Sequence, residues 1–290
     1  MSLRELFEKR KFVLTAEIEP PKGTDVSKFL ETAESLKGKV DGINVTDQQS
    51  AVMRLGSLAA CHLLRDKGFE VIYQITCRDR NRIALQSDLL SAAVLGIENV
   101  LILTGDHPCL GDHPDAKAVF DLDSVQLLKV AKSLGEGHDI AGNELKKAPK
   151  LFLGAALNPC ADPLEPEFIK TEKKVKAGAS FFQTQAVYDT ERFKQFTENI
   201  KHLNVFIMAG IVLLKSAKMA RYMNEKIAGV NIPDPIIERI EKADDKRKES
   251  IEISVSIIKE IQKFCHGIHF MALGWEELIP EIITRLNLTK

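Results

Sequence analysis

The chain has 290 residues, of which 44% are hydrophobic and 28% charged, as in an ordinary globular protein. Its 40 basic and 41 acidic residues leave a net charge of −1, which argues against binding to nucleic acid or to an anionic membrane surface. The charged first twelve residues lack a signal sequence, and no apolar run approaches the roughly 18 residues of a membrane span. The five cysteines are odd in number and widely spread, which argues for a reducing compartment, so we expect a cytoplasmic protein. Their spacing, with no C-x-x-C pair, predicts no metal site.

Short, nearly continuous apolar runs recur along the chain, and longer amphipathic stretches separate them. Such runs are typical of strands covered on both faces, as in parallel sheets. The expected strands cover residues 13–18, 42–46, 71–76, 99–104, 151–157, 180–185, 205–210 and 268–273. The expected helices cover residues 26–38, 57–68, 82–96, 122–135, 165–178 and 190–201. Several of these helical segments end in glycine, as a helix C-cap would.

Eight strands that alternate with helices predict an α/β protein with one domain over residues 1–290, a (β/α)8 TIM barrel. A doubly wound open sheet is the main alternative, but no G-x-G-x-x-G motif follows the first strand. Residues 233–264 add an extra helical pair before the last strand. The charge run at 243–250 is interpreted as a solvated junction between these two helices.

In a TIM barrel the active site lies at the carboxyl ends of the strands. The first expected strand ends in Glu17 and Glu19, and we expect one of them to point into the barrel and the other outward. An inward carboxyl in apolar surroundings could act as a general acid, and a solvated carboxylate at a strand end is the alternative. Strands two and three end in amides and hydroxyls that could bind a polar heterocycle or satisfy backbone groups of the barrel.

The fourth strand leads into a long loop that starts with Thr104-Gly105-Asp106-His107-Pro108 and runs to Phe120. A second Gly-Asp-His-Pro follows within this loop and raises the idea of a metal site through His107 and His113. Asp, Gly and Pro are ordinary turn residues, however, and they explain the repeat without a metal.

The sixth strand ends in Gln183-Thr184-Gln185, and alternation places its two glutamines on one face. A glutamine inside an apolar strand is costly unless its amide is hydrogen-bonded. Both a substrate-binding role and a structural role are open for these side chains.

Five motifs, taken together and in this order, resemble the methylenetetrahydrofolate reductases. They are Ala-Glu-Ile-Glu-Pro-Pro at 16–21, Leu-Thr-Gly-Asp-His-Pro at 103–108, Phe-Asp-Leu-Asp-Ser-Val at 120–125, Ala-Gly-Ala at 177–179 and Gln-Thr-Gln at 183–185. The resemblance runs from about residue 10 to about residue 280. It implies a barrel that carries FAD at its C-terminal face and reduces 5,10-methylenetetrahydrofolate to 5-methyltetrahydrofolate.

The resemblance also implies roles for individual residues. Glu17 matches the catalytic glutamate, which protonates the folate so that its methylene bridge opens. Asp106 matches the catalytic aspartate, which binds the pterin and tunes the flavin, and Gln185 and Met219 fall at positions that contact the substrate. The residues implied to contact the flavin are Thr46, Gln74, Thr104, Gly105, Asp106, Phe120, Asp121, Asn158, Asp162, Glu167 and Lys174.

The chain departs from the family pattern at Gln74, Asn158, Asp162, Met219, Met223 and Trp275. The two methionines stand where better-known bacterial enzymes carry a glutamine and a phenylalanine, and that phenylalanine helps to hold folate and nicotinamide. The changes would suit FMN as well as FAD, and they argue against direct use of NAD(P)H.

The pattern resembles the short catalytic subunit of reductases from anaerobes, in which an iron–sulfur partner subunit delivers electrons. No cysteine set for an iron–sulfur cluster exists in this sequence, so such clusters would lie on the partner. The electron donor is then NAD(P)H or that partner, and we expect a homo- or hetero-oligomer. Two alternatives stay open: another barrel enzyme of pterin chemistry, such as a methyltransferase or lyase, and a subunit that is active only with its partner.

Overall fold

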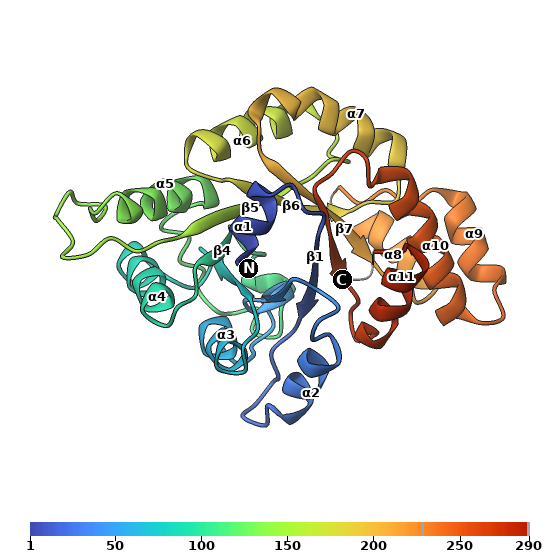
Figure 1. The fold of residues 1–290 in the computed structure, drawn as a ribbon, viewed down its shortest axis with the longest axis horizontal. Helices are drawn as coiled ribbons and strands as arrows, with labels where there is room; N and C mark the ends of the chain where they lie inside the picture. Colours follow the sequence, from blue (N-terminus) through green and yellow to red (C-terminus); the bar gives the residue numbers. More distant parts are fainter. Residues whose placement is uncertain (228, 289–290) are drawn as a thin grey trace.

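Eight parallel strands close into a barrel in the order in which they occur along the chain (Figure 1). The computed structural model describes residues 1–227 and 229–288. The strands are β1 Val13–Ile18, β2 Gly42–Val45, β3 Val71–Thr76, β4 Asn99–Leu103, β5 Phe152–Leu157, β6 Phe181–Ala186, β7 Phe206–Val212 and β8 Gly267–Met271. The predicted (β/α)8 barrel is confirmed, and each expected strand agrees with the observed one to within two residues at either end.

Helices surround the barrel and follow the strands along the chain. The α-helices are α1 Leu3–Glu8, α2 Ser27–Ser35, α3 Ser57–Asp66, α4 Arg82–Val94, α5 Ser124–Gly135, α6 Glu165–Lys176, α7 Thr190–Ile200, α8 Ala217–Lys226, α9 Asp234–Lys242, α10 Lys246–Ile261 and α11 Ile279–Arg285. Short 3-10 helices are η1 Gln49–Ala51, η2 Pro108–Leu110, η3 Lys201–Leu203 and η4 Glu276–Leu278. The extra pair before the last strand is α9 and α10, and the charge run lies at their junction as predicted.

Several helix boundaries follow local sequence signals. The side chain of Asp123 caps α5 by accepting a hydrogen bond of 2.7 Å from the backbone N–H of Gln126. Gly68 and Gly96 follow α3 and α4 with φ angles of +82° and +74°, which is the predicted glycine C-cap geometry.

Among the described residues, none of the helices combines the length and apolar character that crossing a membrane requires.

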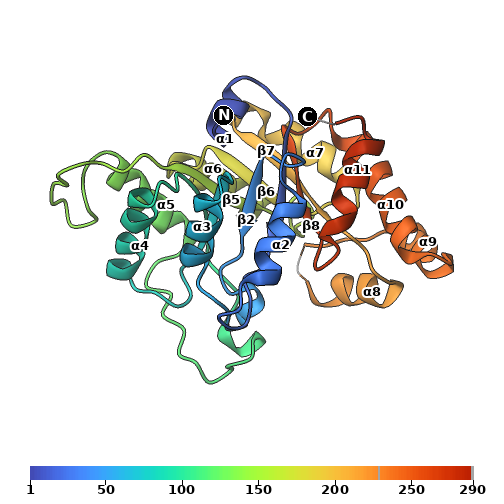
Figure 2. The same cartoon turned by 60° about the horizontal axis from the view of Figure 1, so that its bottom comes forward.

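One end of the barrel is filled by apolar side chains. Helix α1 covers the amino-terminal ends of the strands and packs Phe7 against Phe206, with ring centroids 4.7 Å apart. Inside the barrel, Phe152 stacks on Phe181 at 5.0 Å, and a Cβ at Gly154 would lie only 2.2 Å from the Phe181 ring. Figure 2 shows α1 and both termini at this end, with the long β4–α5 loop at the opposite end. A ligand site must therefore lie at the carboxyl ends of the strands.

Candidate active site

Two buried amides cross the barrel interior one layer above the phenylalanines. The side-chain N–H of Asn44 donates to Gln183 Oε1 at 2.7 Å, and the Gln183 amide donates back to Asn44 Oδ1 at 3.0 Å. Each amide therefore satisfies the other in the core. Gln183 points inward as alternation predicts, whereas the hydroxyl of Thr184 points outward and accepts a hydrogen bond from the backbone N–H of Gly210.

Glu17 ends the inward face of β1 and is held by side chains from three other segments. Its Oε2 accepts a hydrogen bond of 2.9 Å from the amide of Gln74, and its Oε1 accepts one of 3.3 Å from the amide of Gln49. The Nε2 atom of His269 lies 3.5 Å from Oε2. The Glu17 side chain is 10% exposed, so the barrel mouth holds a carboxyl group in a mostly polar but sheltered setting.

The neighbouring carboxyl group of Glu19 faces the other way, although alternation would place residues 17 and 19 on one face, because β1 ends at Ile18 and Glu19 lies beyond it. It lies outside the barrel interior, 2.6 Å from Nε of Arg54, and is 40% exposed. Partial burial raises the pKa of Glu19, and the positive charge of Arg54 opposes that rise. Only one of the two predicted strand-end carboxyl groups therefore points into the barrel.

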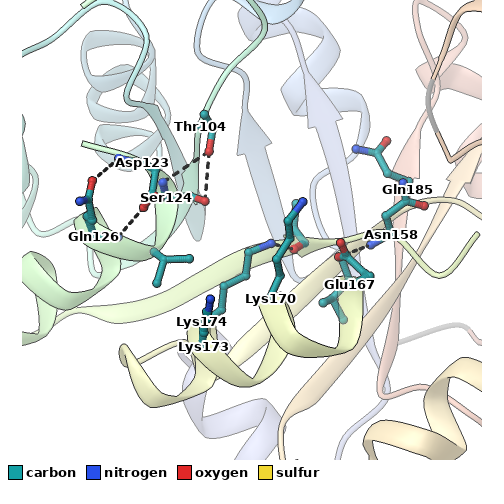
Figure 3. Close-up of a pocket in the computed structure, with 13 residues that line it drawn as sticks. Thr104, Asp123, Ser124, Gln126, Asn158, Glu167, Lys170, Lys173, Lys174 and Gln185 are labelled. Atoms are coloured by element: carbon teal, nitrogen blue, oxygen red, sulfur yellow. Dashed lines mark hydrogen bonds between the residues drawn. The ribbon is translucent and has the colours of Figure 1, made fainter. Parts of the chain in front are cut away.

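A cavity of about 590 Å³ opens beside the ends of β4, β5 and β6 (Figure 3). It is lined by Thr104, Asp123, Ser124, Val125, Gln126, Ala156, Leu157, Asn158, Glu167, Lys170, Lys173, Lys174 and Gln185. Its size is typical of small-molecule sites, which measure roughly 300–1,000 Å³. Five of the predicted site residues, from four different elements or loops, therefore meet at one cavity: Thr104, Asn158, Glu167, Lys174 and Gln185.

Helix α6 supplies a cationic wall to this cavity (Figure 3). Lys170, Lys173 and Lys174 follow the i, i+3, i+4 spacing that places side chains on one helix face. The ammonium group of Lys174 donates to the carbonyl oxygen of Ala156 at 2.6 Å, and burial lowers the pKa of Lys174. Motif reasoning identified only Lys174, although the spacing alone could have identified the other two.

The opposite wall is the amino-terminal end of α5. The Thr104 hydroxyl forms a hydrogen bond of 3.1 Å with the Ser124 hydroxyl, so the end of β4 is joined to the start of the helix. Glu167 lies on the α6 side and accepts a hydrogen bond of 2.9 Å from the backbone N–H of Asn158. The cavity thus combines a helix N-terminus, hydroxyl groups and lysines, a combination suited to an anionic ligand.

The turn after β4 requires its glycine. Gly105 has a φ angle of +90°, and a Cβ there would lie 3.0 Å from Cβ of Thr76 and 3.2 Å from Cβ of Arg78. The buried guanidinium group of Arg78 reaches the carbonyl oxygen of Asp106 at 3.4 Å, while the Asp106 side chain is exposed. The turn is therefore fixed to the end of β3 and presents Asp106 to the solvent.

The Gly-Asp-His-Pro repeat forms turn contacts in the β4–α5 loop. The backbone N–H of Cys109 donates to Nδ1 of His107 at 3.2 Å, and His113 pairs with Asp112 at 2.8 Å. Asp112 also accepts a hydrogen bond from the backbone N–H of Met53, which joins this loop to the β2–α3 loop. Within residues 1–227 and 229–288, no group of three or more His, Cys, Asp or Glu side chains could hold a metal ion.

The other predicted site residues lie outside the lining of the cavity. They are Glu17, Thr46, Gln74, Gly105, Asp106, Phe120, Asp121, Asp162 and Met219. Of these, Phe120 stacks on His107 with ring centroids 6.2 Å apart, and Asp121 accepts hydrogen bonds from Arg82. Their roles toward flavin and folate stay predictions.

Two positions that depart from the family pattern have well-defined surroundings. Met223 is only 5% exposed and packs into the core between the barrel and its helices. The ring of Trp275 lies near two cations, with Lys215 Nζ at 5.4 Å and the Arg247 guanidinium carbon at 5.1 Å from its centroid. Two positively charged side chains therefore lie beside Trp275.

His269 is a site residue that the motif analysis missed. It is 3% exposed on β8, and its Nδ1 atom lies 3.0 Å from the hydroxyl oxygen of Thr15. The signal was available in the sequence, because a histidine inside an apolar strand needs polar partners for the same reason as Gln183.

Known proteins are similar to this chain over most of its length. Residues 2–287 match the family model described as methylenetetrahydrofolate reductase. The chain is 26% identical over 235 residues to methylenetetrahydrofolate reductase 2 of Schizosaccharomyces pombe, a match that covers 74% of this chain and 35% of that protein. It is 25% identical over 271 residues to 5,10-methylenetetrahydrofolate reductase of Pectobacterium carotovorum, covering 89% and 85%.

A probable NADPH-dependent methylenetetrahydrofolate reductase of Caenorhabditis elegans is 23% identical, and the match covers 99% of this chain and 44% of that protein. The chain thus spans less than half the length of these two eukaryotic relatives.

Solved structures show the same fold. A Clostridium thermocellum protein described as binding two copies of 5-methyl-5,6,7,8-tetrahydrofolic acid superposes with a TM-score of 0.68, at 18% identity over 99% of both chains. A 2,3-dimethylmalate lyase superposes with a TM-score of 0.54, at 12% identity over 98% of this chain and 84% of that one. Since the family model matches nearly its whole length, the chain belongs to the methylenetetrahydrofolate reductase family.

Proposed function

We propose that this protein is a flavin-dependent oxidoreductase that reduces 5,10-methylenetetrahydrofolate to 5-methyltetrahydrofolate. The observation that carries the proposal is the position of Glu17, a sheltered carboxyl group at the barrel mouth that amides from two other segments orient. Family membership supports the reaction class, and the folate bound by the C. thermocellum protein supports the ligand class.

The residues at the barrel mouth fit a flavin. The hydroxyl of Thr46 is buried and has no hydrogen-bond partner among the described residues, so a ligand that reaches it could satisfy it. The lysines of α6 and the start of α5 suit the phosphate groups of FAD. FMN would use the same phosphate contacts and is the alternative. When bound, the flavin would supply the hydride.

The carboxyl groups and amides of the chain would act on the folate. Glu17 would hold a proton and deliver it to the folate, so that the methylene bridge opens to the species that accepts hydride. Asp106 would bind the pterin from the exposed turn after β4, and Gln185 would contact the folate from the end of β6. Met219 would contact the substrate from the half-buried face of α8.

The electron donor would be NAD(P)H or an iron–sulfur partner subunit. The burial of Met223 favours the partner subunit over NAD(P)H as the electron donor. A side chain packed into the core is not presented to a nicotinamide. We therefore propose an oligomer, either of copies of this chain alone or with a partner subunit that reduces the flavin, as in the short catalytic subunits of reductases from anaerobes.

A spectroscopic experiment tests the reaction. The purified protein is mixed with FAD or FMN, freed of excess flavin, reduced with dithionite under anaerobic conditions, and mixed with methylenetetrahydrofolate. We expect the flavin spectrum to return to its oxidised form with formation of methyltetrahydrofolate, measured by chromatography. Failure to retain either flavin, together with no reoxidation after flavin is added back, would contradict the proposal. Rapid NADH oxidation by the isolated chain would contradict the need for a partner.

A further inference from the structure

We propose that His269 is a positioning residue that orients the carboxyl group of Glu17 and directs its proton to Oε1. The inference rests on the proposed function, in which Glu17 delivers that proton. Since His269 itself is 3% exposed, it is expected to act through Glu17 and to make no contact with the folate.

Thr15, His269 and Glu17 form a chain of contacts across the neighbouring strands β1 and β8. Thr15 on β1 is paired in register with His269 on β8, and its hydroxyl oxygen lies 3.0 Å from Nδ1 of the ring. Glu17 follows two residues later on the same face of β1, and its Oε2 lies 3.5 Å from Nε2 of the ring. The imidazole therefore stands between a hydroxyl and a carboxyl group of one strand.

This placement determines which ring nitrogen carries the hydrogen. With the hydrogen on Nδ1, the lone pair of Nε2 would face a carboxylate oxygen, which is unfavourable. With the hydrogen on Nε2, the ring can donate toward Glu17, while Nδ1 accepts a hydrogen bond from the buried Thr15 hydroxyl. A separation of 3.5 Å is long, and catalytic contacts of this kind often tighten when substrate binds.

The donors around Glu17 then distinguish its two oxygens. Oε2 faces the N–H groups of Gln74 and His269, whereas Oε1 faces only the amide of Gln49, at 3.3 Å. Two donors stabilise negative charge on Oε2, so the proton of the neutral carboxyl group belongs on Oε1. His269 therefore fixes both the rotamer of Glu17 and the oxygen that delivers the proton.

A kinetic test separates this role from simple packing. His269→Leu removes both ring nitrogens, whereas His269→Gln keeps an N–H donor on a side chain of similar reach. We expect H269L to slow reoxidation of the reduced flavin by methylenetetrahydrofolate by about tenfold to a hundredfold, the range for a lost hydrogen bond to a charged group. Reoxidation by ferricyanide needs no proton from Glu17 and should be unchanged, and H269Q should restore most of the lost rate.

The outcomes distinguish the inference from the proposed function. If the wild-type protein does not react with methylenetetrahydrofolate, the proposed function fails. If it reacts and H269L matches it, or if H269L slows both acceptors equally, the positioning role is wrong. His202→Gln, at an exposed position of η3, is the matched control and should behave like the wild type.

A second measurement needs no activity. Nitrogen-15 NMR of the histidine rings reports which ring nitrogen is protonated, and comparison with H269Q assigns the signal of His269 among the seven histidines. We expect a protonated Nε2 and an unprotonated Nδ1, and Thr15→Val should weaken that preference because it removes the hydroxyl donor. A protonated Nδ1 in the wild-type protein would overturn the assignment.

Discussion

Asn44 and Gln183 donate their side-chain amides to each other across the barrel, at 2.7 and 3.0 Å. The two residues are 139 positions apart in the sequence. Asn44 is also level with Glu17 in the ladder between β1 and β2. The amide pair therefore forms a buried polar link across the barrel, at the level of Glu17 on β1.

Removing one amide of this pair should cost more stability than removing both. Gln183→Met leaves the Asn44 amide buried without its partner, and we expect the free energy of unfolding to fall by about 1–3 kcal/mol. The double variant N44L/Q183M should recover part of this loss, because no unsatisfied amide remains. Urea denaturation followed by circular dichroism measures both values, with Gln195→Met on the exposed face of α7 as control. Strictly additive losses would show that the amides are not coupled.

The contact between Asp121 and Arg82 should make the β4–α5 loop sensitive to acid. Hydrogen bonds from the Arg82 side chain and backbone hold the pKa of Asp121 at about 2, below its usual value. Because the folded-state pKa is the lower one, the contribution of this contact is complete above the unfolded-state pKa of about 3.9 and is lost as the pH falls through about 2. A carbon-13 NMR titration should therefore give a midpoint near 2.

The same contact can be tested at neutral pH. Asp121→Asn should increase amide hydrogen exchange at the end of the loop, around residues 119–123, because the charged hydrogen bonds to Arg82 are lost. Asp115→Asn, at an exposed position of the same loop, is the control and should leave that exchange unchanged. Equal effects of the two variants, or a carboxyl midpoint near 4 for Asp121, would show that the ion pair does not hold the loop in solution.

The strands could be predicted from the sequence because a parallel barrel buries both faces of each strand. The resulting apolar runs were located to within two residues at either end. These are properties of single strands, so neighbouring residues carry the information.

The cavity could not be predicted in the same way, because it forms only when closure of the barrel brings distant segments together. Thr104 and Lys174 are 70 positions apart, and only the fold places the start of α5 opposite the lysines of α6. Hydrophobic periodicity carries no signal for such contacts. The role of His269 was missed for a related reason, since its partners lie on β1, at the other end of the chain.

Glu17→Gln should abolish proton delivery while leaving the flavin site intact. A glutamine keeps the size of the side chain but has no proton to transfer at neutral pH, so folate-dependent reoxidation should slow by about 10²–10⁴-fold, the usual contribution of a general acid. Flavin affinity and reoxidation by ferricyanide should not change. Glu19→Gln is the matched control, because Glu19 lies two residues away and faces Arg54 outside the barrel. Stopped-flow absorbance measures each rate, and equal rates for the two variants would remove Glu17 from the mechanism.

Lys174→Met should weaken flavin binding without disturbing the barrel. Lys174 lines the cavity beside the start of α5, and loss of one charged hydrogen bond to a phosphate group should raise the dissociation constant about tenfold to a hundredfold. Lys176→Met is the matched control, because Lys176 lies on the same helix, pairs with Glu172 and does not line the cavity. Titration of the protein with FAD, followed by flavin fluorescence, compares the two variants with the wild type. If both variants bind FAD as tightly as the wild type, the phosphate groups do not lie against the cationic wall of α6, and the flavin must be placed elsewhere at the barrel mouth.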